Sequence, residues 1–173
     1  MKYTIRHAGP QDCREIMRLI VELSVYEKLE EQVNITHKEL EVDGFGENPF
    51  FKCLVAEVPE DKRTKEGHTV VGYSMYYFAY SPWKGRSICM EDLYVMPNFR
   101  GQGIGKALMC GIAKIGWDNK CTRLQFVVLD WNKPSIDFYK SHGAQNVTEK
   151  EGWQEMRIDD NAMEKLAQMA PKI

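Results

Sequence analysis

The sequence lacks any apolar run near the roughly 20 residues that a helix needs to cross a bilayer. Its start, Met1-Lys2-Tyr3-Thr4-Ile5-Arg6-His7, has basic side chains but no apolar segment after them. We therefore expect no signal peptide, no membrane partner and a cytoplasmic location. Flexible linkers, internal repeats and low-complexity segments are also missing. At 173 residues, the chain is predicted to form a single domain spanning residues 1–173.

Paired cysteines are missing as well. The cysteines are odd in number and none forms a C-x-x-C pair: Cys13, Cys53, Cys89, Cys110 and Cys121. The four histidines lie far apart along the chain. The sequence therefore predicts neither a disulfide framework nor a metal site, and we expect the cysteines to be small buried apolar residues.

An excess of positive charge is also absent. The chain has 23 basic and 25 acidic residues, a formal net charge of −2 and an estimated pI near 6.1. Proteins that bind nucleic acid usually have a basic surplus, because much of their affinity comes from neutralising phosphates. We therefore expect no nucleic-acid partner, and a cationic ligand suits this charge better.

Helix and strand patterns alternate along the chain, which predicts an α/β layered domain. Pro10 opens a helix with Ile16, Leu19 and Leu23 on one face, and Thr36-His37-Lys38-Glu39 fits a capping box. Further helices are expected at residues 103–119, 134–142 and 161–169. The expected strands are residues 3–8, 51–58, 70–80, 87–96, 124–129 and 153–158, with the second to fourth in an antiparallel meander.

The segment Met96-Pro97-Asn98-Phe99-Arg100-Gly101-Gln102-Gly103-Ile104-Gly105-Lys106 joins an apolar strand to an amphipathic helix. Its glycines allow a sharp turn whose amides and helix N-terminus can hold a pyrophosphate. The dinucleotide pattern G-x-G-x-x-G fails, because Lys106 stands where the last glycine belongs, and no P-loop G-K-[ST] follows. Purely structural turns of this kind are common, so the pattern alone leaves both interpretations open.

Two motifs resemble the GNAT family of N-acetyltransferases. Arg100 to Gly105 matches its pyrophosphate signature R-x-x-G-x-G, and residues 132–144, N-K-P-S-I-D-F-Y-K-S-H-G-A, resemble its later motif. Tyr26-Glu27 and Glu151-Gly152-Trp153 are similar to the diamine acetyltransferases, a subfamily that includes spermidine/spermine N-acetyltransferase. Ser81-Pro82-Trp83 departs from the polyamine enzyme, which has an aspartate before the Pro-Trp pair, and leans toward the thialysine acetyltransferase branch. The resemblance covers about residues 3–170.

The resemblance implies a GNAT fold, an α/β arrangement with a mixed curved β-sheet flanked by helices, acting as a homodimer. It also implies acetyl-CoA as co-substrate and the primary amine of a small molecule as acceptor. The residues implied to bind acetyl-CoA are Leu93, Tyr94, Val95, Arg100, Gly101, Gln102, Gly103, Ile104, Gly105, Lys106, Asn132, Lys133, Pro134, Ser135 and His142. Those implied to bind the amine are Tyr26, Glu27, Glu91, Gln125, Phe126, Val127 and Glu151.

Acetyl transfer needs a base for the amine and an acid for the departing thiolate. By resemblance, Glu91 is the water-mediated base and Tyr139 the acid. From the residues alone, Tyr139 also fits a core aromatic, and Glu91 with Asp92 also fits a solvated strand end. Other functions that stay open are a strict spermidine/spermine acetyltransferase, a protein-lysine acetyltransferase and a CoA-binding module without catalysis.

Overall fold

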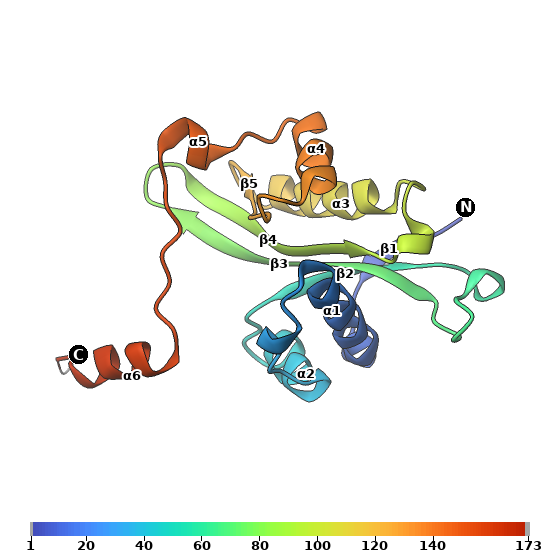
Figure 1. The fold of residues 1–173 in the computed structure, drawn as a ribbon, viewed down its shortest axis with the longest axis horizontal. Helices are drawn as coiled ribbons and strands as arrows, with labels where there is room; N and C mark the ends of the chain where they lie inside the picture. Colours follow the sequence, from blue (N-terminus) through green and yellow to red (C-terminus); the bar gives the residue numbers. More distant parts are fainter. Residues whose placement is uncertain (1, 172–173) are drawn as a thin grey trace. The chain divides into compact units, whose positions relative to one another are not determined.

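The computed structural model describes residues 2–171, which form two compact units that divide after Leu129. The first unit contains a five-stranded sheet with helices on both of its faces (Figure 1). In the described residues from Asp130 onward, the second unit contains helices and connecting segments but no strand. Every strand of the described chain therefore belongs to the first unit.

The sheet has the order β1-β2-β3-β4-β5, so neighbouring strands follow one another in sequence. The strands are β1 (Thr4–His7), β2 (Lys52–Glu57), β3 (Val70–Ser81), β4 (Gly85–Val95) and β5 (Leu124–Gln125). The first four run antiparallel, and β5 runs parallel to β4 after a helical crossover. The predicted meander and the mixed α/β sheet are both confirmed.

Helices cover the two faces of this sheet. α1 (Cys13–Glu27) and α2 (His37–Phe45) lie on one face and α3 (Ile104–Asp118) on the other (Figure 1). Ile16 and Leu19 of α1 are fully buried, as are Leu108 and Ile112 of α3. Each such side chain contributes roughly 1.5–3 kcal/mol through burial. The short 3-10 turns are η1 (Pro10–Asp12), η2 (Glu30–Gln32), η3 (Glu60–Lys62) and η4 (Pro97–Phe99).

Side-chain hydrogen bonds set where α2 begins and join α1 to the sheet. The Glu39 amide donates to Thr36 Oγ1 and the Thr36 amide donates to the Glu39 carboxylate, so the predicted capping box is confirmed. Arg18 joins α1 to the sheet by donating to the Val70 carbonyl at 2.7 Å. α1 ends at Lys28, whose φ of 61° is left-handed.

The second unit contains α4 (Lys133–Ser141), α5 (Val147–Glu151) and α6 (Asp160–Gln168). The amide of Ser135 donates to the Asn132 side chain, which caps α4, and Pro134 lies in its first turn. Gly143 follows the end of α4 with a φ of 92°. The helices expected at residues 134–142 and 161–169 are therefore confirmed within one or two residues.

Two predicted strands were wrong. Only Leu124 and Gln125 of residues 124–129 form a strand, because pairing with β4 stops there, and Val127 is 66% exposed. Residues 153–158 form no strand. A strand needs a neighbouring strand to pair with, and the described part of the second unit offers none.

The five cysteines are free thiols. Cys13, Cys53 and Cys89 are buried, as predicted for small apolar residues. Cys110 was predicted wrongly, because it lies on the exposed side of α3, and Cys121 is half-buried.

Candidate active site

The turn between β4 and α3 forms a cradle of backbone amides, defined here as residues 100–106. Gly101 and Gly103 have φ angles of 73° and 85°, in the left-handed region that favours glycine. Gly103 is the N-terminal cap of α3, and the Ala107 amide bonds to its carbonyl. The N–H groups at the start of α3 point out of the helix end, where its dipole is positive. This arrangement suits a phosphate.

The space beside Gly101 is open, because a Cβ there would meet no atom of the described residues within 4 Å. A Cβ at Gly103 would lie 3.4 Å from Tyr3 Oη, whereas one at Gly105 would make an ordinary 3.8 Å contact with Val95. Gln102 Oε1 is buried and has no hydrogen-bond partner among the described residues. The residues present therefore fit an anionic ligand that also offers an N–H or O–H donor, as acetyl-CoA does.

β4 changes register at Glu91. Met75 of β3 pairs with Asp92 and Tyr76 pairs with Met90, so Glu91 is the extra residue of a β-bulge and is exposed. Bulges bend a strand and re-aim its side chains, and they are common beside active sites. On the other edge of β4, pairing with β5 ends at Cys89. Within the described residues no strand covers that edge at Leu93–Val95, although the Val95 carbonyl accepts from Arg100 Nε at 2.8 Å.

Asp92 lies next to the bulge, and Glu27 of α1 is near enough to repel it; these two carboxylates are called the acidic pair. Tyr73, which packs in the core against α1, donates to Asp92 Oδ2 at 2.7 Å. Burial raises the pKa of Asp92 above its ordinary value, and the Tyr73 bond offsets only part of that rise. Burial and repulsion from Asp92 likewise raise the pKa of Glu27.

Neither of these carboxylates forms an ion pair within residues 2–171. Asp92 and Glu27 repel each other without a compensating cation. A ligand ammonium between them would favour the ionised form of both and lower both pKa values. The pair is therefore a place where a positive charge stabilises the protein.

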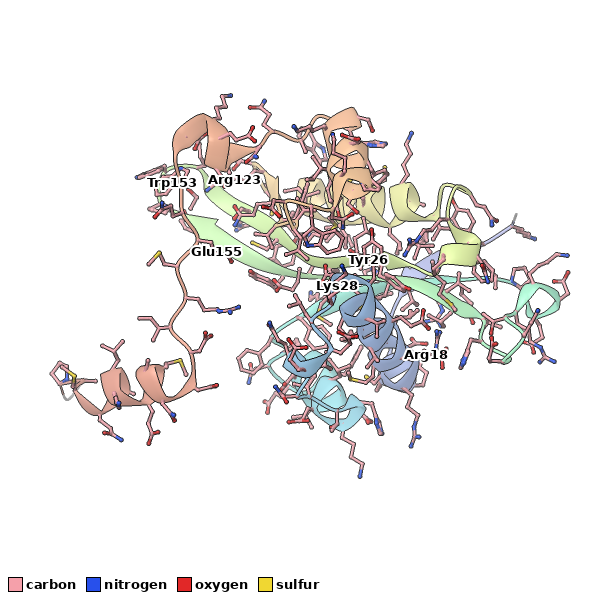
Figure 2. The ribbon with its side chains drawn as sticks, in the orientation of Figure 1. Arg18, Tyr26, Lys28, Arg123, Trp153 and Glu155 are labelled. Carbon is pink, nitrogen blue, oxygen red and sulfur yellow. The ribbon has the colours of Figure 1, made fainter. Side chains whose placement is uncertain are left out.

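The end of α1 meets the cradle through aromatic contacts. Tyr26 is 37% exposed, and Figure 2 shows it with Lys28 where α1 reaches the sheet. The Arg100 guanidinium carbon lies 5.3 Å from the Tyr26 ring centroid and 5.5 Å from that of Tyr94. Residues predicted to bind the amine and the cofactor are therefore direct neighbours here.

Other predicted residues of the first unit lie where β5 leaves the sheet. Gln125 ends β5 and donates to Cys89 Sγ at 3.1 Å. Phe126 and Val127 follow it outside the strand. Lys106 is exposed in the first turn of α3, and Ile104 is buried.

The second unit places most of its predicted residues on α4. Tyr139 is half-buried and contacts the Phe138 ring edge-on at 5.4 Å between centroids. His142 Nδ1 lies 2.8 Å from the Phe138 carbonyl oxygen. Glu151 ends α5 and accepts a 2.9 Å hydrogen bond from Trp153 Nε1. The remaining members of this set are Asn132, which caps α4, and Lys133, Pro134 and Ser135 in its first turn.

The structure thus groups the cradle, the β4 residues and the end of α1, whereas the α4 residues form a second group within their own unit. The sequence interpretation missed Asp92 as a site residue. The available signal was its place beside Glu91 in an apolar strand, since an unpaired buried charge is costly. In residues 2–171 no group of three or more His, Cys, Asp and Glu side chains could hold a metal ion. No helix in that range has the length and apolar character to span a membrane.

The Acetyltransferase (GNAT) family profile matches residues 19–144. The chain is 51% identical over 163 residues to a thialysine N-epsilon-acetyltransferase of Bos taurus, covering 94% of this chain and 96% of that one. It is 40% identical over 168 residues to a human spermidine/spermine N(1)-acetyltransferase-like protein 1, covering 97% of this chain and 24% of the human one.

A solved structure has a similar fold. It is an integron cassette protein from the mobile metagenome of V. cholerae, 26% identical, with a TM-score of 0.75. The match covers 97% of this chain and 99% of that one.

We predict that Gly103→Ala weakens acetyl-CoA binding by tenfold or more. The added Cβ forces a left-handed residue out of its φ of 85° and so displaces the amides of the cradle. Isothermal titration of acetyl-CoA measures the effect. Gly105→Ala is the matched control, because its Cβ makes an ordinary contact, and it should bind within about threefold of wild type. Equal affinity in all three proteins would contradict the cradle.

We predict that Asp92→Asn raises or preserves the melting temperature of the ligand-free protein at about pH 8. Burial raises the folded-state pKa of Asp92 above the ordinary 3.8, so the folded protein binds more protons than the unfolded chain within that window. Stability from this group is therefore present below about pH 3.8 and is lost as pH rises through the raised value. The Asn side chain avoids that loss and still accepts from Tyr73. Each 1 kcal/mol gained corresponds to about 2–4 °C.

Thermal unfolding at about pH 5 and about pH 8 measures the difference between variant and wild type. The gain from Asp92→Asn should be larger at the higher pH. Asp61→Asn is the control, because Asp61 is exposed and should leave both temperatures unchanged. A loss of several degrees in Asp92→Asn at about pH 8 would mean that the ionised carboxylate stabilises the fold.

Proposed function

The chain belongs to the Acetyltransferase (GNAT) family, and from this we propose that it acetylates the primary amine of a small cationic molecule. Membership makes it an acyltransferase that uses acetyl-CoA as co-substrate and transfers acetyl groups to amines. The observation that supports a cationic acceptor is the pair of carboxylates at Glu27 and Asp92, which lacks a cation in the described residues. Thialysine, a lysine analogue, is the acceptor we favour, because relatives about 50% identical are named for it.

Acetyl-CoA is proposed to bind along the open edge of β4 and over the cradle. The amides of Gly101–Gly105 would hold its pyrophosphate at the positive end of α3. Backbone groups of Leu93–Val95 are proposed to bond its pantetheine arm and acetyl carbonyl, because no described strand covers that edge of β4. The Val95 carbonyl also accepts from Arg100 Nε. On α4, Asn132, Ser135 and His142 are proposed cofactor contacts, together with Lys133 and Pro134.

The nitrogen of the ammonium must lose two protons in the course of the transfer, and the departing sulfur must gain one. The amine nitrogen attacks the thioester carbonyl carbon, the C–S bond breaks and the CoA thiolate leaves. Glu91, exposed at the bulge, is proposed to accept the ammonium proton through water, because a protonated amine has no lone pair for attack. Tyr139 is proposed to give its hydroxyl proton to the departing sulfur, and the second proton that the nitrogen loses as the amide forms restores the hydroxyl.

The amine is proposed to contact Tyr26 and Glu27 on one side, with Gln125, Phe126, Val127 and Glu151 as further contacts. Ser81 stands where the polyamine enzyme has an aspartate, and its hydroxyl accepts from the amides of Trp83 and Lys84 in the β3–β4 turn. It is 5% exposed. It therefore stabilises the turn and adds no negative charge for a long polyamine, which favours a shorter amine.

We further propose that residues 1–173 act as a single N-acetyltransferase domain. We also propose that the protein works as a cytoplasmic homodimer. A strict spermidine/spermine acetyltransferase, a protein-lysine acetyltransferase and a CoA-binding module without catalysis are the alternatives that the acceptor assay separates.

We predict a higher kcat/KM for thialysine than for spermidine, with a lysine peptide acetylated least. The acidic pair of Glu27 and Asp92 is proposed to bind one ammonium, whereas the extra charges of a polyamine lack a carboxylate partner at Ser81. Initial rates of CoA release with each amine measure this. Spermidine preferred by tenfold or more would assign the strict polyamine activity, and a preferred peptide would assign the protein-lysine activity. Acetyl-CoA binding without turnover of any amine would indicate the non-catalytic module.

Two variants with the same charge change test, in the same assay, whether Glu27 contacts the amine. Glu27→Gln should lower kcat/KM for the preferred amine by about 10- to 150-fold, the value of one charge-assisted contact. Glu30→Gln makes the same charge change on an exposed residue just after α1 and should stay within about twofold. If both variants lowered kcat/KM equally, Glu27 would act only through the overall negative charge of this surface and not through a direct contact with the amine.

We predict that Glu91→Gln lowers kcat by tenfold or more at about pH 7 and less as pH rises. An amine with a pKa near 10 arrives increasingly deprotonated at higher pH, so the base matters less. A pH profile of kcat up to about pH 9.5 measures this. A loss that does not change with pH would instead assign Glu91 to binding or structure.

A further inference from the structure

Arg100 lies between the two ligand sites of the first unit, and its side chain turns back toward the sheet. Its Nε donates to the Val95 carbonyl at 2.8 Å, at the end of β4. The guanidinium then lies against the rings of Tyr26 and Tyr94, at 5.3 and 5.5 Å from their centroids. Both distances are within the roughly 6 Å of a cation–π contact. The residue that begins the cradle therefore contacts the end of α1.

The Tyr94 side of this contact is anchored in the core. Tyr94 is 6% exposed and donates to Glu22 Oε2 at 3.1 Å, and Glu22 accepts from Arg18 at 2.6 Å. Arg18 in turn donates to the Val70 carbonyl of β3. Figure 2 shows Arg18 farther along α1 from Tyr26. The middle of α1 is thus tied to the sheet independently of Arg100.

The Tyr26 side lies in the last turn of α1, one residue before Glu27 and two before the left-handed Lys28. That turn contains no basic side chain, and the C-terminal end of a helix has a partial negative charge. The Arg100 guanidinium beside Tyr26 is therefore favourable for two reasons. It is attracted by the face of the ring and by the partial negative charge of the helix end. This contact holds the turn that includes two proposed amine contacts.

We propose that Arg100 is a positioning residue that couples acetyl-CoA binding to amine binding. A phosphate held by the amides of Gly101 and Gly103 restrains the backbone immediately after Arg100. Its Val95 bond and ring contacts transmit that restraint to Tyr26 and Glu27. The bound cofactor thereby orders the amine side, and by reciprocity the amine tightens the cofactor. The inference rests on the proposed function, in which Tyr26 contacts the amine.

The test is the KM for thialysine measured at saturating acetyl-CoA. Arg100→Gln should raise this KM by about 2- to 30-fold, the range expected for one lost cation–π contact. Arg100→Lys keeps a cation near the rings and should restore part of the loss. A role confined to phosphate binding would raise only the KM for acetyl-CoA, and saturation would remove its effect.

Lys106→Gln is the matched control, because it removes one positive charge from the same cradle without a ring contact. It should raise the KM for acetyl-CoA and leave the KM for thialysine at saturating acetyl-CoA within about twofold. Circular dichroism and thermal unfolding verify that each variant is folded. If Arg100→Gln behaves like Lys106→Gln in both constants, the coupling is overturned.

Tyr26→Leu and the double variant Arg100→Gln/Tyr26→Leu complete a double-mutant cycle. If Arg100 acts through Tyr26, the two single effects on the KM for thialysine should be less than additive. Fully additive effects overturn the inference. If Tyr26→Leu alone leaves that KM unchanged, Tyr26 does not contact the amine. That part of the proposed function is then wrong, and the coupling through Tyr26 is overturned with it. A raised KM in Tyr26→Leu with none in Arg100→Gln overturns the coupling alone.

Discussion

The register shift at Glu91 in β4 is the constraint on which the first unit depends. A one-residue slip in a strand moves every later side chain to the opposite face of the sheet. With the bulge, Asp92 and Tyr94 both point toward α1, where they bond Tyr73 and Glu22. Without it, both bonds would be lost and Asp92 would no longer face Glu27. The bulge at Glu91 lies two residues after Cys89, where β5 stops pairing with β4.

Elements with local signals were predictable from the sequence, and elements that depend on a distant partner were not. The capping box at Thr36, the apolar face of α1 and the proline in the first turn of α4 each act within one or two turns of helix. Residues 124–129 and 153–158 have the composition of strands, but a strand forms only where another strand pairs with it. That information lies in the bend of β4 and in the absence of any strand in the described second unit.

The candidate site divides in the same way. The two glycines with positive φ could be identified from the sequence, because their role depends on the backbone and on one adjacent helix end. The side chain of Arg100 could not, since the sequence does not reveal that it turns back to Val95 and meets Tyr26. Asp92 could be predicted only in part. The sequence shows that it lies in an apolar strand, but only the folded structure shows that Tyr73, 19 residues away, donates a hydrogen bond to it.

The two carboxylates near the end of α1 raise the free energy of the ligand-free protein. Glu27 lies at the negative end of a helix whose last turn has no basic residue, and it is repelled by Asp92. Burial adds a desolvation cost to both carboxylates. Neither carboxylate forms an ion pair within residues 2–171. In the proposed function, a bound ammonium would offset their mutual repulsion and oppose the pKa rise that burial causes, so part of this electrostatic cost would be recovered as binding free energy.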